Sequence, residues 1–171
     1  MGQKIGGQTG DFAIYVDGDN LLGIAEVKLP EVKFKTQTIN GGGIVGDIEF
    51  TNHYAVESLE AEVKFNTVSA PAFKLMDLSG KLLEMKAAII EADGTTHILS
   101  QTGFRVAMKG QSKSVDLGTV KLNELLGTSF KFEATYLECW LNGQSLYKVD
   151  KFNGIVEQMG ISLIKKLPDL F

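Results

Sequence analysis

The chain has 171 residues, of which 44% are hydrophobic, and its formal net charge is −4. This length suits a single domain over residues 1–171 that buries about two-thirds of its unfolded surface, and the hydrophobic content excludes global disorder. The lysines are scattered along an acidic chain, so the sequence lacks the basic stripe with which nucleic-acid-binding modules grip phosphates.

Cys139 is the only cysteine, so the chain forms no internal disulfide. The first residues, MGQKIGGQTG, contain no apolar segment of the kind that a secretory signal needs. No apolar run approaches the ~20 residues of a membrane-spanning helix. We therefore expect a protein that is made in the cytoplasm and has no membrane anchor.

Most segments from residue 12 onward alternate between apolar and polar residues, as half-buried β-strands do. The run over 12–30 contains a turn at 17–20, and strand-like segments follow over 32–39 and 45–50. The most regular alternation is LEAEVKFN, residues 59–66. There Leu59, Ala61, Val63 and Phe65 are expected on one face, with Glu60, Glu62 and Lys64 on the other.

A short α-helix is expected over about residues 70–79. Ser69 can cap it, Pro71 suits its first turn, and Gly80 would end it. Its apolar residues are Phe73, Leu75 and Met76.

The C-terminal half predicts two more hairpins, one with a type I′ turn at Asp93-Gly94 and one at Asn142-Gly143. The polar stretch 110–128 between them predicts a long connection, and residues 151–167 predict a turn of helix. Within 129–141, the even spacing of Phe132, Tyr136 and Trp140 predicts one buried strand face, packed against Phe104, Val106 and Met108. These elements predict a mainly β fold, an antiparallel β-sandwich or partly open barrel with one short α-helix and a long extended hairpin.

Candidate active sites fail on spacing. His53 and His97 lack the further nitrogen or sulfur ligands that zinc requires. The segment 17–20, DGDN, begins like a calcium loop, but two leucines follow it, which favours a hairpin turn. Ser162 and Lys165 match an S-x-x-K motif without its companion motifs. We expect no catalytic residue, no cofactor and no metal, and hence no enzyme.

The stretch 40–45 is the most unusual in the chain, because Asn40 is followed by three glycines, Gly41, Gly42 and Gly43, and then directly by Ile44 and Val45. Glycines that cradle a phosphate connect a strand to a helix, whereas strand-like sequence lies on both sides here. The glycines therefore indicate a flexible hairpin tip. Its exposed apolar residues would be a liability in a monomer, so we expect another subunit to cover them.

The arrangement of these segments resembles that of the major tail tube proteins of contractile-tailed phages and phage-tail-like bacteriocins. In the C-terminal half, FRVAMKGQSKSVDLG (104–118) resembles the family's strand ending in Met-basic-Gly, and TYLECWLNGQSLYKVDKFNGIVEQMG (135–160) its paired strands around an Asn-Gly turn. In the N-terminal half, LPEVKFKTQTINGGGIVG (29–46) resembles its Gly-rich hairpin, and SAPAFKLMDLSG (69–80) occupies the place of its helix. The likeness covers about residues 12–165. Gln111 and Ile161-Ser162 depart from the family's usual Arg and Val-Asp.

The resemblance implies a structural virion protein whose subunits form stacked, homohexameric rings, the inner tube of a contractile tail. The implied partners are further copies of the chain, a contractile sheath protein, a tape-measure protein inside the tube, the baseplate hub and the tail terminator. In a phage, DNA would later pass through without sticking. The implied location is the tail tube of a virion or bacteriocin particle, assembled in the cytoplasm of the host bacterium.

Two site assignments follow from the resemblance. Residues 32–50 would be a hairpin that reaches the adjacent ring, with Asn40, Gly41, Gly42, Gly43, Ile44 and Val45 at the contact. Glu60 and Glu62 are expected to face the lumen, where carboxylates repel phosphates; from the residues alone they are a solvated strand face or an acid/base pair.

Two alternatives remain open. One is the tube protein of a type VI secretion system, which is the same class of object with a different cargo. The other is a monomeric β-sandwich that binds carbohydrate or peptide. Such a module usually exposes aromatic side chains as a platform for its ligand.

Overall fold

A computed structural model describes residues 2–21, 24–77 and 81–171. In order along the chain, the strands are β1 (Lys4–Val16), β2 (Asp19–Leu21), β3 (Ile24–Lys28), β4 (Phe34–Ile39), β5 (Ile48–Val56), β6 (Glu60–Phe65), β7 (Leu83–Asp93), β8 (Leu99–Asp116), β9 (Thr128–Leu141), β10 (Gln144–Asp150), β11 (Ile155–Gln158) and β12 (Ile161–Ser162). Two 3₁₀ helices accompany them, η1 (Ala70–Met76) and η2 (Leu167–Leu170). The expected mainly β, antiparallel fold is confirmed, and its main sheet does not close into a barrel.

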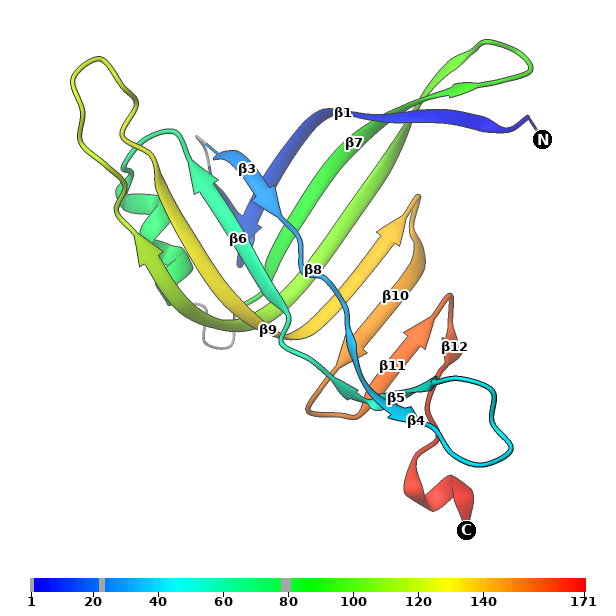
Figure 1. The fold of residues 1–171 in the computed structure, drawn as a ribbon. Helices are drawn as coiled ribbons and strands as arrows, with labels where there is room; N and C mark the ends of the chain where they lie inside the picture. Colours follow the sequence, from blue (N-terminus) through cyan, green and yellow to red (C-terminus); the bar gives the residue numbers. More distant parts are fainter. Residues whose placement is uncertain (1, 22–23, 78–80) are drawn as a thin grey trace.

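The main sheet is strongly curved, and its strands follow the order β12-β11-β10-β9-β8-β7-β1-β2 (Figure 1). A branch leaves this path at β9, which also pairs with β6, and β6 pairs in turn with β3. Strands β4 and β5 form a separate two-stranded sheet that projects beside the C-terminus. All the strand pairs are antiparallel.

The long strand β9 changes its partner halfway along. Its first half pairs with β6 and its second half with β10, while β8 runs along the other edge throughout. At the change, the register with β8 skips Thr135, because Gly110 pairs with Ala134 and Lys109 pairs with Tyr136. Thr135 is thus the extra residue of a β-bulge, and its carbonyl accepts a hydrogen bond from the Lys151 amide.

This bulge reverses the faces of β9. Phe130, Phe132 and Ala134 are buried before it, whereas Leu137 is buried after it. The expectation that Phe132, Tyr136 and Trp140 share one buried face is therefore wrong, because the inserted residue shifts the period-two alternation by one. Trp140 lies on the face opposite the core, where the Arg105 guanidinium stands 4.4 Å from the centre of its ring.

The core lies between the curved sheet and the branch formed by β3 and β6, and η1 covers one end of it. Val106 and Met108 are buried as expected, and Phe104 packs against them from a half-buried position. The Phe130 ring makes edge-to-face contacts with Phe65 and Phe73, with centroids 5.6 and 5.4 Å apart. The alternation over 59–65 is confirmed. Its buried members are Leu59, Ala61, Val63 and Phe65.

The expected α-helix is a 3₁₀ helix that spans Ala70–Met76. Pro71 lies in its first turn as expected, but the Ser69 side chain makes no capping hydrogen bond. With three residues per turn, side chains three apart lie on one face, so Ala72 and Leu75 are buried together while Met76 is exposed. Gly80, the expected helix end, lies outside the described residues.

The turns divide between confirmed and corrected expectations. Asp17-Gly18 and Asn142-Gly143 have the positive φ angles of two-residue hairpin turns. The β7–β8 hairpin exists, but its loop is longer than the expected type I′ turn, because the Asp93 carboxylate accepts hydrogen bonds from the amides of Thr95 and Thr96. None of the helices in the described ranges has the length and apolar composition to cross a bilayer.

Two expected irregular or helical segments are strands instead. The first half of 110–128 continues β8 as far as Asp116, where its polar residues alternate on a largely solvated strand. The region 151–167 forms β11 and β12 rather than a turn of helix, and η2 begins only at Leu167.

Gly110 is required by a close backbone approach at the bulge. A Cβ at this position would stand 1.9 Å from the Glu133 carbonyl oxygen, whereas a Cβ at Gly103 on the same strand meets no atom within 4 Å. We predict that Gly110→Ala lowers the free energy of unfolding by about 3 kcal/mol, the upper end of overpacking costs, while Gly103→Ala changes it by less than about 1 kcal/mol. Denaturant melts of both variants measure this, and equal stabilities would contradict the assigned bulge.

The reversal of β9 predicts unequal costs for its two aromatic residues. Phe132→Ala should lower the free energy of unfolding by ~3–5 kcal/mol, since the side chain is 1% exposed in the core. Trp140→Ala should cost only about 1–2 kcal/mol, the value of a half-buried ring with one cation–π contact. The same melts test the pair, and an equal cost at Trp140 would place it in the core.

Candidate functional site

The hairpin of β4 and β5, hereafter the arm, projects from the main sheet beside the C-terminal segment (Figure 1). Its root closes where the Glu57 amide donates to the Lys33 carbonyl over 2.8 Å, so the arm spans residues 33–57. The expected hairpin at 32–50 is therefore present, but its returning strand is longer. A two-stranded hairpin on its own is marginally stable in water, so the arm gains most from contact with another surface.

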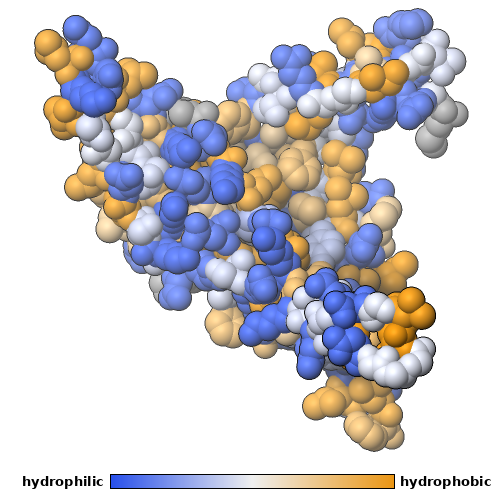
Figure 2. All heavy atoms as spheres, in the orientation of Figure 1, coloured by the Kyte–Doolittle hydropathy of each residue, from blue (hydrophilic) through white to orange (hydrophobic). Residues whose placement is uncertain are grey.

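One face of the arm is apolar toward its tip. The cross-strand pairs Ile39–Ile48 and Gln37–Phe50 lie on one face, and Thr38–Glu49 and Thr36–Thr51 on the other. Ile39, Ile48 and Phe50 are all exposed. Figure 2 shows hydrophobic residues at the far end of the arm and over the neighbouring C-terminal segment.

The tip spans residues 40–47. The side-chain amide of Asn40 at its start donates a hydrogen bond of 3.1 Å to the carboxylate of Asp47 at its end. Gly43 has φ +86°, a backbone conformation that favours glycine, whereas Gly41 and Gly42 do not have positive φ and have open space at their Cβ positions. The Ile44 amide donates to the Gly41 carbonyl, which makes a tight turn. Val45 is fully exposed, and Ile44 is 38% exposed.

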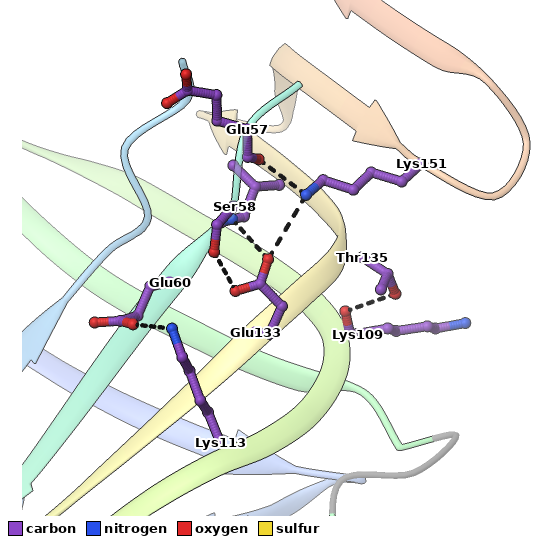
Figure 3. A network of polar contacts seen from close by, with 9 residues as sticks. Glu57, Ser58, Glu60, Lys109, Lys113, Glu133, Thr135 and Lys151 are labelled. Carbon is purple, nitrogen blue, oxygen red and sulfur yellow. Dashed lines mark hydrogen bonds and ion pairs between the residues drawn. The ribbon is translucent and has the colours of Figure 1, made fainter. Parts of the chain in front are cut away.

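The root of the arm is anchored to the main sheet through Glu133 on β9 (Figure 3). The Glu133 carboxylate accepts hydrogen bonds from the Ser58 hydroxyl and from the Leu59 amide, the latter 3.0 Å long. Lys151, which follows β10, places its Nζ 3.7 Å from the same carboxylate and donates to the Glu57 carbonyl over 2.9 Å. Because these contacts join three separate elements, the chain leaving the arm is fixed where it enters β6.

Glu60 and Glu62 share the solvated face of β6, as expected, but they are not alone there. Lys113, a bulged residue of β8, donates to the Glu60 carboxylate over 2.6 Å, and Lys131 lies 3.8 Å from it. Glu62 stands opposite Lys131 on β9 and Lys28 on β3. The face is thus a mixed lattice of carboxylates and lysines rather than an acidic strip.

The ion pair between Glu60 and Lys113 shifts both groups. The hydrogen bond and charge of Lys113 hold the pKa of the Glu60 carboxyl below its usual value, and Glu60 raises the pKa of Lys113 in return. Since the folded carboxyl has the lower pKa, the pair stabilises the fold above the ordinary carboxyl range. That contribution is lost as the pH falls through the lowered pKa.

The sequence did not single out Glu133, Lys151 or Tyr54 as participants. Tyr54 lies on β5, and its hydroxyl donates to the Lys165 carbonyl over 2.6 Å. The hydrogen bonds of Glu133 to Ser58 and Leu59, of Lys151 to Glu57 and of Tyr54 to Lys165 all join residues more than 70 positions apart, so no local motif signals them. In the described ranges, no group of three or more His, Cys, Asp or Glu side chains is placed to hold a metal ion.

Comparison with known proteins gives a family match over most of the chain. The family described as phage tail tube protein FII matches residues 9–167. The chain is also 26% identical over 154 residues to the major tail tube protein of Serratia phage KSP20, covering 89% of this chain and 87% of that protein.

Two solved structures have the same fold at low sequence identity. Both come from an extracellular contractile injection system, PVC, in its extended state. One belongs to its sheath/tube terminator, with a TM-score of 0.53 and 10% identity over 77% of this chain and 94% of the other. The second belongs to its sheath-tube complex, with a TM-score of 0.53 and 9% identity over 75% and 87%.

Proposed function

The chain belongs to the phage tail tube protein FII family, and we propose that its copies form stacked hexameric rings, the inner tube of a contractile tail. The tube role itself follows from the family, whose members are structural proteins. The hexameric rings, the surrounding sheath and the contents of the channel do not follow from family membership and belong to the proposal. Arm contacts between rings are part of the same proposal.

The observation that carries the proposal is the arm. It forms its own sheet, its root is fixed by Glu133 and Lys151, and its apolar residues are exposed. An anchored root and an exposed apolar end are typical of a segment that binds a neighbouring subunit. We assign Asn40, Gly41, Gly42, Gly43, Ile44 and Val45 to that contact.

The energetics of the arm favour templated assembly. Ordering a mobile residue costs ~1–2 kcal/mol, and burying Ile44 or Val45 returns ~1.5–3 kcal/mol each. Two side chains therefore offset only part of the cost of ordering the tip, Asn40–Asp47. Burial of Ile39, Ile48 and Phe50 offsets more of this cost. A preformed ring presents all the surfaces that receive the arms at once, which favours growth further.

The proposed partners follow the tube's position in a contractile tail. They are further copies of the chain, a sheath protein outside, a tape-measure protein inside, and the baseplate hub and tail terminator at the ends. The likeness to chains from a sheath-tube complex and a sheath/tube terminator supports the sheath protein and the terminator among these partners. The particle is a phage or a phage-tail-like bacteriocin, and assembly takes place in the cytoplasm of the host.

We assign Glu60 and Glu62 to the lumen. Their strand face is polar throughout, and Lys28, Lys113 and Lys131 balance the carboxylates on it. A balanced lattice leaves few lysines free to replace the counterions of DNA, so DNA would pass without binding.

The alternatives account for less. A type VI secretion tube shares the architecture, but the matched family is named for phage tails. A monomeric ligand-binding sandwich leaves the apolar face of the arm without a purpose. The relatives matched are structural proteins, which favours a protein without catalytic activity.

Replacing Ile44 and Val45 with Asp should abolish tube formation while leaving the fold intact. The tip contributes few native contacts, so circular dichroism and melting temperature should stay near those of the native chain. Each ring interface would, however, repeat the new charges six times. Electron microscopy after addition of baseplates measures assembly, and hydrogen exchange should show the amides of Gly41, Gly42 and Gly43 fast in the subunit and slow in the tube.

The matched control for this variant is a pair of Asp substitutions at exposed Ser100 and Gln101, far from the arm along the chain. It adds the same charge and should still polymerise. Tubes formed by the Ile44 and Val45 variant, or tip amides already protected in the subunit, would contradict the assignment of the arm.

Replacing Glu60 and Glu62 with Gln should make assembled tubes retain DNA. The change keeps side-chain size but leaves Lys113 and Lys131 without their carboxylate partner, so retention should weaken as salt rises. Co-sedimentation of tubes with short DNA measures it, with exposed Glu31 and Glu124 changed to Gln as the charge-matched control. Equal retention of DNA by both variants would contradict the assignment of Glu60 and Glu62 to the lumen.

A further inference from the structure

The arm is connected to the C-terminal segment as well as to its own root. The Tyr54 hydroxyl donates to the Lys165 carbonyl over 2.6 Å and accepts from the Lys165 amide over 3.1 Å. One side chain thus satisfies both polar groups of a single residue's backbone, 111 positions away. Figure 1 shows the C-terminal segment beside the arm.

Tyr54 lies at an irregularity in the arm. Phe34 pairs with Val56, but the next residue, Lys35, pairs with Asn52, so three residues of β5 bulge out of the ladder. The Asn52 side chain accepts a hydrogen bond from the Tyr54 amide and stabilises the bulge. A bulge bends a strand and interrupts its ladder, so this is the joint at which the outer part of the arm can change direction.

The C-terminal segment is itself fixed to the main sheet. The Leu163 amide donates to the Val156 carbonyl of β11 over 2.8 Å, and the Ser162 hydroxyl donates to the Ile164 carbonyl. Tyr54 therefore connects the joint of the arm to the sheet edge formed by β11 and β12.

We propose that the C-terminal segment, residues 163–171, is a strap that sets the direction of the arm through the pair of hydrogen bonds between Tyr54 and Lys165. Without the strap, the arm pivots at residues 53–55 and its tip samples a wider range of positions. A tip that is held in place loses less freedom on docking. The effect of the strap on tube assembly rests on the proposed function, whereas its restriction of the arm within one subunit does not.

The strap also extends the apolar surface of the arm. Leu167, Leu170 and Phe171 are exposed at the same end of the molecule. A second copy of the chain that covers the arm would contact the strap as well, so docking would tighten the connection rather than release it.

The direction of the arm can be measured without reference to assembly. Spin labels are placed at Gly42→Cys on the tip and Ser100→Cys on β8, with Cys139→Ser removing the native thiol. Pulsed electron resonance then gives the distribution of distances between the labels in the unassembled subunit. Tyr54→Phe keeps the ring and removes the hydroxyl, and Tyr15→Phe is the matched control. Removal of residues 165–171 is the second test.

We expect one narrow distribution for the native chain and for Tyr15→Phe, and a clearly broader one for Tyr54→Phe and for the truncated chain. A distribution that stays unchanged in both of these variants overturns the strap. Tube growth by Tyr54→Phe on added baseplates should be about three- to tenfold slower, as loss of one or two net hydrogen bonds implies. Growth at the native rate despite a broadened distribution overturns the role in assembly. If the native chain forms no tubes, the proposed function fails, and if the Ile44 and Val45 variant forms tubes, the assignment of the arm to the contact between rings fails. In either case the distances still decide on the strap.

Discussion

The approach of Gly110 to the backbone of Glu133 and Ala134 is the constraint on which the rest of the molecule depends. With no Cβ at residue 110, β8 can stay paired with β9 across the extra residue Thr135. There β9 leaves β6 and begins to pair with β10, and the buried face passes from even to odd positions. Close to the bulge on β9, the Glu133 carboxylate accepts hydrogen bonds from Ser58 and Leu59. The bulge that shapes the core therefore also positions the residue that anchors the root of the arm.

Several segments project from the main sheet and its core (Figure 1). Exposed large apolar side chains gather on them: Ile39, Ile44, Val45, Ile48 and Phe50 on the arm, Leu117, Val120, Leu122 and Leu125 on the loop before β9, and Leu167, Leu170 and Phe171 at the C-terminus. Such surfaces disfavour a solitary subunit and favour one that is covered by neighbours. Family membership identifies the covered state as a tube.

The sequence predicted features that depend on neighbouring residues and missed those that depend on distant ones. The alternation of residues 59–65, the Asn142-Gly143 turn and the glycine tip follow from local chemistry. The bulge at Thr135 did not, because its cause is a contact with Gly110 across the sheet and the aromatic spacing of Phe132, Tyr136 and Trp140 concealed it. At the candidate site, the face of Glu60 and Glu62 was predictable, but Lys113 reaches it through a bulge, and Glu133 and Tyr54 act on segments far away in sequence.

Electron cryomicroscopy of tubes grown from the purified chain tests the central claim most directly, because it shows what covers the arm. We predict hexameric rings in which residues 40–47 are ordered and Ile44 and Val45 lie against a subunit of the adjacent ring. An arm that contacts only its own ring, or that stays exposed to solvent in a complete tube, would contradict it.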